Sequence, residues 1–138
     1  MRWFKLDIDM LRDPKMESLV ERYGAEGVGV WVAALAHMYA SISDGVPFVE
    51  ADALTRRVAS DVNLGKKRVK NILNFIAELG LFDPEFWAVG KAANERVAEA
   101  YESYERKVRA AVVARERAAR GQSGEAGNQA CDQGPNQA

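Results

Sequence analysis

The stretch NLGKKRVKNILNFIAELGLF, residues 63–82, constrains the fold more than any other part of this 138-residue chain. On a period of 3.6 residues, its aliphatic side chains share one face of a helix, namely Val69, Ile72, Leu73, Ile76 and Leu79. The opposite face is polar and contains Lys67, Lys70, Asn71, Asn74 and Glu78. The spacing therefore predicts a helix from Gly65 to Leu79 that buries one face in a core and leaves the other for a second purpose.

The start of this helix is densely cationic. All residues from Lys66 to Lys70 except Val69 are cations, although the whole chain has a formal net charge of −1. Exposed cations at a helix N-terminus oppose the macrodipole by roughly 0.3–1 kcal/mol each, so folding alone would favour Asp or Glu there. A local rule broken in this way often marks a functional site. The simpler alternative is a charged face that contacts only water.

The neighbouring segments suggest what the basic helix does. Before it, the sequence predicts a short helix over 51–60 that bears Arg56 and Arg57, and Asn63 is placed to cap the helix that follows. After it, residues 81–89 (LFDPEFWAV) predict a hairpin. Helix, turn, helix and hairpin in this order form a winged helix-turn-helix, whose second helix enters the major groove of DNA.

The N-terminal part of the chain predicts one strand and two helices. Residues 3–10 (WFKLDIDM) alternate apolar and polar side chains, which predicts a half-buried strand. Asp13 and Pro14 are typical of a helix start, and Gly24 of its end. Residues 25–43 are apolar nearly all round, so we expect a helix that runs through the middle of the fold.

These elements give a fold class that is mainly α with a small β-sheet. Residues 46–49 (VPFV) predict a short edge strand, and nothing breaks a helix between residues 91 and 120. The tail has no large apolar residue, so we expect it to be disordered. The predicted organisation is a winged helix-turn-helix domain over 1–90, a long basic helix over 91–120 and a disordered polar tail over 121–138.

The polar residues of this arrangement suit a duplex. Lysine contacts phosphates or guanine, and asparagine can pair with adenine through two hydrogen bonds. We expect DNA contacts from the two short helices and from the basic half of the last helix: Arg56, Arg57, Lys66, Lys67, Lys70, Asn71, Asn74, Arg106, Lys107 and Arg109.

The predicted hairpin differs from a wing that follows DNA. It carries Asp83 and Glu85 where Lys or Arg would contact phosphate, and like charges repel there. We therefore expect this wing to pack against the domain, with Phe86 and Trp87 as core or interface residues.

Other functional classes find no support. His37, the single histidine, lies in a predicted buried helix and is expected to be packed and hydrogen-bonded rather than a metal ligand. GAEGVG resembles a dinucleotide-binding loop only loosely, because no strand precedes it. We expect no metal, no cofactor and no enzymatic activity. Cys131 is the single cysteine, and residues 27–43 fit a buried helix better than a membrane span, so we expect a cytoplasmic protein without a membrane partner.

Three pieces of the sequence resemble a known family. The order D-x-D-M, D-P-K and Y-G-A-E-G-x-G-V-W within residues 7–31, followed by the basic helix and LGLFDPEFW, is similar to the N-terminal winged-helix domain of phage replisome organisers, the DnaD-like replication initiators. The likeness covers roughly residues 1–105. It implies origin binding, initiation of phage DNA replication, and a replicative helicase or helicase loader as partner. Lys91 departs from the family pattern, which often has Ser or Thr at the start of the last helix.

Two alternatives use the same elements differently. Val97, Tyr101, Tyr104 and Val108 recur at spacings of four and three, which predicts a short seam for a homodimer. The chain would then be a protein-interaction module that pairs with a copy or a replication partner through its last helix. A small winged-helix transcriptional regulator would use the same DNA contacts as a replication factor.

Overall fold

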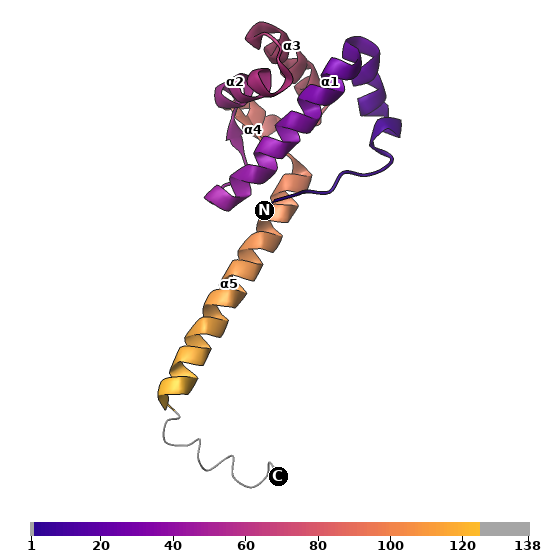
Figure 1. The fold of residues 1–138 in the computed structure, drawn as a ribbon. Helices are drawn as coiled ribbons and strands as arrows, with labels where there is room; N and C mark the ends of the chain where they lie inside the picture. Colours follow the sequence, from indigo (N-terminus) through magenta and orange to yellow (C-terminus); the bar gives the residue numbers. More distant parts are fainter. Residues whose placement is uncertain (1, 125–138) are drawn as a thin grey trace. The chain divides into compact units, whose positions relative to one another are not determined.

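The computed structural model of the chain describes residues 2–124 (Figure 1). The chain divides into two units, Met1–Tyr101 and Glu102–Ala138. Every buried apolar side chain among the described residues belongs to the first unit. The core therefore lies within the first unit.

The longest helix of the first unit is α1 (Pro14–Ser41), which follows a short 3-10 helix, η1 (Met10–Arg12). Its start is the predicted one, because the Asp13 carboxylate accepts a hydrogen bond from the backbone N–H of Lys15 at 2.8 Å. At Gly24 the backbone leaves helical geometry, with φ of 60° and ψ of −144°. The two predicted helices are therefore the two arms of α1, joined directly at this kink.

A second 3-10 helix, η2 (Ile42–Asp44), leads to the helix-turn-helix, which consists of α2 (Ala51–Val62) and α3 (Lys66–Glu78). Asn63 lies between them in the left-handed conformation, with φ of 55°, and its N–H bonds to the carbonyl of Ala59. Asn63 thus ends α2, and the prediction that it caps α3 is wrong. The cap position of α3 belongs to Gly65, which has no side chain to offer.

The core lies where α1, α2 and α3 meet (Figure 1). Its central side chains are at most 1% exposed: Leu19, Val30, Met38, Leu54, Val58, Val69, Ile72, Leu73 and Ile76. Burying each such side chain favours folding by about 1.5–3 kcal/mol. The apolar stripe predicted for α3 is confirmed at its four intrahelical positions, and Leu79 follows the helix half-buried.

The predicted hairpin is wrong, because residues 84–88 form a short helix, α4 (Pro84–Ala88). The Asp83 carboxylate accepts from the backbone N–H groups of Glu85 and Phe86 at 2.9 and 3.4 Å, so Asp-Pro starts a helix here instead of a turn. The segment does pack against the domain: the Trp87 ring stacks on Phe82 at 4.9 Å.

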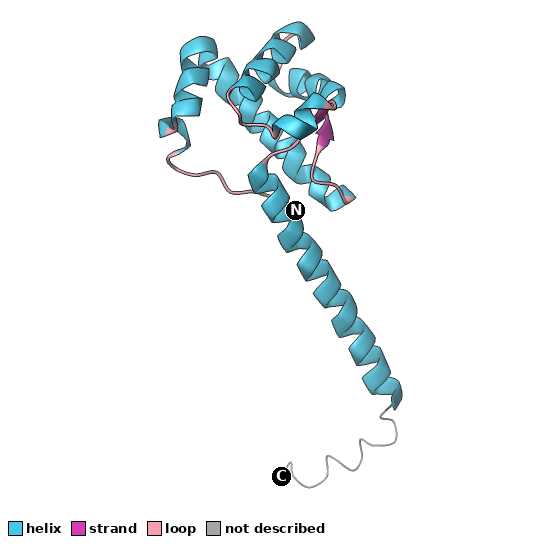
Figure 2. Ribbon diagram, turned by 180° about the vertical axis from the view of Figure 1, so that it is seen from behind, coloured by secondary structure: helices cyan, strands magenta, loops and turns pink. Residues whose placement is uncertain are grey.

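The sheet has two strands, which lie on either side of the helices α2 to α4 in the sequence (Figure 2). β1 (Val49–Glu50) pairs antiparallel with β2 (Lys91–Ala92). The strand predicted over 46–49 is therefore shorter and shifted toward α2. The helix predicted from Lys91 begins four residues later, as α5 (Glu95–Gly124), because Lys91 and Ala92 belong to the sheet.

The predicted N-terminal strand is also wrong. Residues 2–9 have no regular structure, and Ile8 is 98% exposed. A strand needs a neighbour for its backbone hydrogen bonds, and in the described chain β1 and β2 pair only with each other. We call residues 2–9 the N-terminal arm.

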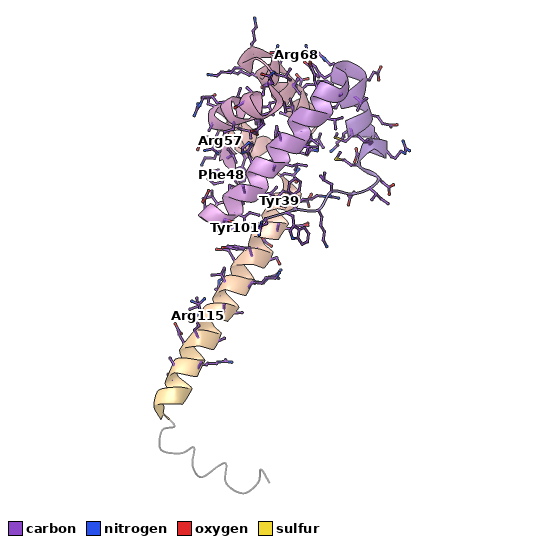
Figure 3. The ribbon with its side chains drawn as sticks, in the orientation of Figure 1. Tyr39, Phe48, Arg57, Arg68, Tyr101 and Arg115 are labelled. Carbon is purple, nitrogen blue, oxygen red and sulfur yellow. The ribbon has the colours of Figure 1, made fainter. Side chains whose placement is uncertain are left out.

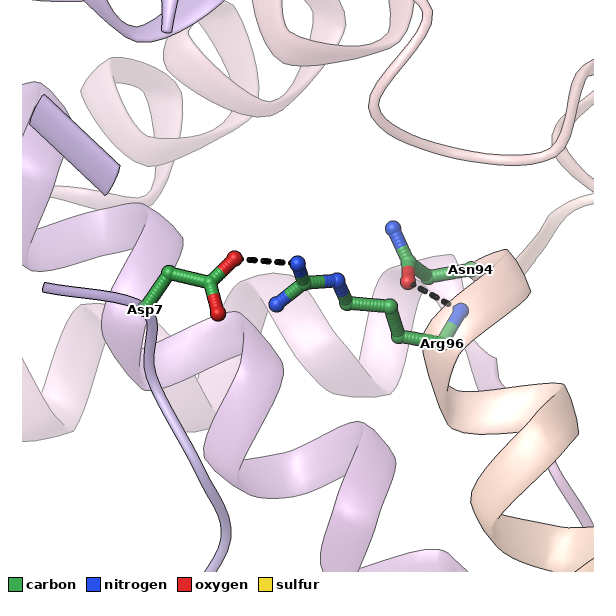
Figure 4. A network of polar contacts seen from close by, with 3 residues as sticks. All are labelled: Asp7, Asn94 and Arg96. Carbon is green, nitrogen blue, oxygen red and sulfur yellow. Dashed lines mark hydrogen bonds and ion pairs between the residues drawn. The ribbon is translucent and has the colours of Figure 1, made fainter. Parts of the chain in front are cut away.

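The N-terminal arm is held against the rest of the first unit by contacts with α1 and with the start of α5. Phe4 stacks on Tyr39 of α1 at 4.8 Å, and Asp7 forms an ion pair with Arg96 of α5 (Figure 4). The hydrogen bond to Asp7 raises the pKa of the Arg96 guanidinium, and burial raises the pKa of the Tyr39 hydroxyl. The Asn94 side chain accepts from the backbone N–H of Arg96 at 2.8 Å, so Asn94 caps the start of α5.

The fold class is as predicted: mainly α, with a small sheet and a long C-terminal helix. α5 extends to Gly124, so residues 121–124 are helical instead of disordered, and the rest of the predicted tail lies outside the described residues. His37 is hydrogen-bonded as expected, to Asp61 at 2.6 Å. Between residues 2 and 124 no helix is both long and apolar enough to cross a membrane.

The kink at Gly24 makes a prediction about stability. Gly24→Ala should lower the free energy of unfolding by about 1–3 kcal/mol, because other residues rarely adopt its backbone conformation. Apart from the adjoining backbone, no atom lies within 4 Å of the added methyl group, so the loss would come from the backbone conformation and not from a clash with other side chains. Urea denaturation of the variant measures this effect.

Gly29→Ala is the matched control, because Gly29 lies in the regular part of α1 and its added methyl group would meet Val62 at an ordinary 3.9 Å. This variant should be unchanged or more stable by about 0.5–1 kcal/mol. Equal losses in both variants would contradict the interpretation of the kink.

Candidate nucleic-acid interface

α3 presents a polar face to solvent. The five predicted contact residues on this helix are all exposed, and we call them the α3 outer face: Lys66, Lys67, Lys70, Asn71 and Asn74. None of their side chains has a hydrogen bond or ion pair to another residue of the described chain. The outer face is held in place because the opposite side of the helix is buried in the core.

Two further exposed cations lie on α2. Arg56 and Arg57 are exposed, and Figure 3 shows Arg57 on α2. Neither has an ion-pair partner between residues 2 and 124. Asp61, the acid of α2 nearest to the turn, is paired with His37 at 2.6 Å. The other acids of these helices, Asp52 and Glu78, form no ion pair in the described part of the chain, so no cation of α2 or α3 is paired with an acid of its own helix.

The beginning of α3 is electrostatically open. Gly65 supplies no capping side chain, and the first turn contains no acid. The unpaired backbone N–H groups of a helix N-terminus and its macrodipole both favour an anion. Lys66 and Lys67 lie at this end, so the local field and the side chains have the same sign. Such an arrangement can bind phosphate.

Arg68 behaves differently from its cationic neighbours. It forms an ion pair with Glu26 of α1 at 2.8 Å, and its guanidinium lies 5.1 Å from the centre of the Tyr23 ring. The sequence identifies Arg68 as a cation of this helix, but no pattern in it predicts the contacts with Glu26 and Tyr23. Its position around the helix axis does set Arg68 apart from the other cations, because it lies on the flank of α3, between the buried stripe and the outer face.

The predicted contacts of the last helix belong to the second unit. Arg106, Lys107 and Arg109 are exposed, and Arg109 lies 3.8 Å from Glu105. At about 100° per residue, Arg106 and Arg109 share one side of α5 and Lys107 points elsewhere. These three residues therefore do not form one stripe.

The predicted dimer seam is divided between the units. Val97 is fully buried in the first unit, and the Tyr101 hydroxyl donates to the carbonyl of Gly45 at 3.0 Å. Tyr104 is half-buried, whereas Val108 is 44% exposed. Of these four seam residues, Val108 alone is exposed.

A hollow of about 670 Å³ lies elsewhere in the first unit, beside the N-terminal arm. Three of its carboxylates already have partners: Asp7 with Arg96, and Asp13 and Asp83 as helix caps. Among residues 2–124, no group of three or more His, Cys, Asp or Glu side chains is placed to hold a metal ion.

Comparison with curated proteins and with solved structures found no match. One family model, described as Lin1244/Lin1753-like, N-terminal, matches residues 3–92. The match includes α1 to α4 and both strands, and with them every candidate contact residue of α2 and α3. Because it spans well over half of the chain, the protein belongs to the Lin1244/Lin1753-like, N-terminal family.

Proposed function

We propose that this chain is a non-enzymatic, cytoplasmic protein that binds double-stranded DNA and acts in the initiation of phage or prophage DNA replication. The observation that carries the DNA-binding proposal is the α3 outer face, which is exposed and unpaired while the other side of the same helix is buried. α3 is the second helix of a helix-turn-helix, the position of a recognition helix. The replication role rests on the resemblance of residues 7–31 to replisome organisers, whose partners would be a replicative helicase or helicase loader.

The proposed contacts divide by chemistry. The unpaired cations of α2 and α3 would bind phosphates, because salt bridges to the backbone need charge but no sequence: Arg56, Arg57, Lys66, Lys67 and Lys70. Asn71 and Asn74 lie three residues apart on the outer face, where an amide can read adenine in the major groove. The interface would therefore combine sequence-independent attraction with a short sequence-specific contact.

The replacement of the wing by α4 limits where further contacts can arise. Lys91, the cation that follows α4 in the sequence, already contacts an aromatic ring, because its ammonium lies 4.5 Å from the centre of the Phe48 ring. Glu85, in the first turn of α4, would repel phosphate. The proposed complex therefore depends on α2 and α3, and a gripping wing is not part of it.

The proposal predicts a strong dependence on salt. If the cations of α2 and the outer face neutralise four or five phosphates, the slope of log K against log salt concentration should be about −4. Replacing Lys67 and Lys70 together by alanine should make the slope less steep by about two, at about 0.9 per phosphate contact. Fluorescence anisotropy with a labelled duplex at several salt concentrations measures both values.

The matched control is Lys5→Ala with Arg12→Ala, which removes the same charge from exposed positions in and next to the N-terminal arm. Its slope should equal that of the wild type. An unchanged slope in the Lys67 and Lys70 variant would remove α3 from the interface, and no retention of any duplex at low salt would reject the DNA-binding proposal.

The charges of α3 also predict opposed effects on folding and binding. Lys66→Glu should raise the free energy of unfolding by about 0.3–1 kcal/mol, because an acid in the first turn suits the macrodipole. Lys70→Glu lies beyond the first turn and should bring no such gain. Both variants should bind duplex more weakly. Thermal denaturation and anisotropy measure the two effects, and a loss of stability in Lys66→Glu would contradict the electrostatic explanation.

A second candidate function is a protein-interaction module, which the exposed valines of α5 favour. Val108 and Val112 are 44% and 43% exposed and lie one turn apart on the side that continues from Tyr104. If a copy or partner packs there, replacing both by glutamate should abolish association in sedimentation velocity. Val113→Glu is the control, because Val113 is equally exposed at 43% but lies about 100° away around the helix from Val112.

A monomeric wild type would reject self-association through α5. A transcriptional regulator would share the DNA contacts proposed above, so binding data do not separate it from a replication factor. Genes for a helicase, a helicase loader or a single-strand-binding protein beside the gene of this chain would favour replication.

A further inference from the structure

We infer that Arg68 is a positioning residue, which fixes the rotation of α3 against α1 so that the outer face is presented to a duplex. This inference rests on the proposed DNA-binding function and adds to it a residue that binds no DNA itself. It concerns a cluster at the junction of two helices, Arg22, Tyr23 and Glu26 of α1 with Arg68 and Phe75 of α3, which we call the α1–α3 clamp.

The guanidinium of Arg68 is held in two ways at once. Its Nε donates to Glu26 Oε1 at 2.8 Å, and its terminal NH2 group lies 2.8 Å from the same oxygen. Its central carbon also lies 5.1 Å from the centre of the Tyr23 ring. A planar group that bonds at its edge and also lies over an aromatic ring has less freedom to turn. Arg68 therefore holds α3 against α1 at one position along the helix.

A second such position lies two turns further along α3. The Phe75 ring meets Tyr23 edge-on, with centroids 5.7 Å apart, and the Arg22 guanidinium lies 4.7 Å from the centre of the Phe75 ring. Arg68 and Phe75 are seven residues apart, so they share one flank of α3. Each contact lies off the helix axis and therefore opposes rotation of α3 about that axis, and two contacts along one flank also oppose a tilt of the helix.

Rotation matters because the outer face is narrow. A helix with its side chains is about 10–12 Å wide, so a turn of about 20° moves a surface group by about 2 Å. Hydrogen bonds to bases tolerate a much smaller displacement than this, since donor and acceptor must stay within roughly 0.3 Å of their preferred separation. The aliphatic core fixes which side of α3 faces inward, and the directional contacts of the clamp set its rotation more finely.

Direct binding of phosphate by Arg68 is the alternative explanation. Its side chain is 51% exposed and that of Glu26 is 44% exposed, so a duplex could reach them. The neighbouring carboxylate opposes this, because it neutralises Arg68 and repels phosphate. The two explanations predict different affinities for duplex when the charges of Glu26 and Arg68 are exchanged.

The experiment is a charge exchange measured by anisotropy against salt. Arg68→Met and Arg68→Glu should weaken duplex binding by about fivefold or more, the range expected from one exposed ion pair and one cation–π contact. The double variant Glu26→Arg with Arg68→Glu keeps the net charge and restores an ion pair between the same two positions. Its affinity for duplex should therefore recover to within about threefold of the wild type, which is about 0.7 kcal/mol when each 1.4 kcal/mol is tenfold. Its salt slope should be unchanged.

Lys67→Met is the matched control, since Lys67 belongs to the outer face. It should lose affinity with a slope less steep by about 0.9, and Glu26→Arg should not restore it. The inference is overturned if the exchanged variant binds as weakly as Arg68→Glu, or if Arg68→Met makes the slope less steep by the same amount as Lys67→Met.

A measurement without DNA separates this inference from the proposed function. In amide NMR spectra, Arg68→Met should shift the signals of Lys67, Lys70 and Asn71, and the exchanged variant should return them toward the wild type. Such recovery supports the clamp even if no duplex binds. Signals of the outer face that stay unmoved in Arg68→Met would refute it.

Discussion

Burial of one side of α3 against α1 and α2 is the interaction on which the rest of the structure depends. Val69, Ile72, Leu73 and Ile76 are at most 1% exposed, so the hydrophobic effect fixes which side of the helix faces inward. The positions of Lys67, Lys70, Asn71 and Asn74 follow from this, because a helix with a buried stripe has only one direction left for its polar face. Core packing thus creates the surface that we assign to DNA.

Several elements could be predicted because their signals are local. The spacing of aliphatic residues predicts α3, and Asp13-Pro14 predicts the start of α1. Other signals were ambiguous, since Asp83-Pro84 suits both a turn and a helix start, and only the bonds of the Asp83 carboxylate decide for α4. The alternation in the N-terminal arm predicts a strand but says nothing about whether another strand is available for pairing.

The candidate site was predictable to a similar extent. Periodicity places the outer face in solvent, and the structure agrees. The partners of Arg68 were not predictable, because Glu26 is 42 residues away in the sequence and no local pattern connects the two. Charge density alone treats Arg68 and Lys67 alike, although one is paired with α1 and the other has no partner in the described chain. Tertiary contacts thus divide the cations of α3 into those that hold the helix and those that can bind a ligand.

A titration of the isotope-labelled protein with a short duplex at low salt tests the assignment of this surface most directly. Our account predicts that the amide signals of Lys67, Lys70, Asn71 and Asn74 move progressively, together with those around Arg56 and Arg57. Signals of the N-terminal arm should stay in place. Movement confined to the arm or to α5, or no movement at any ratio of duplex to protein, would contradict the account.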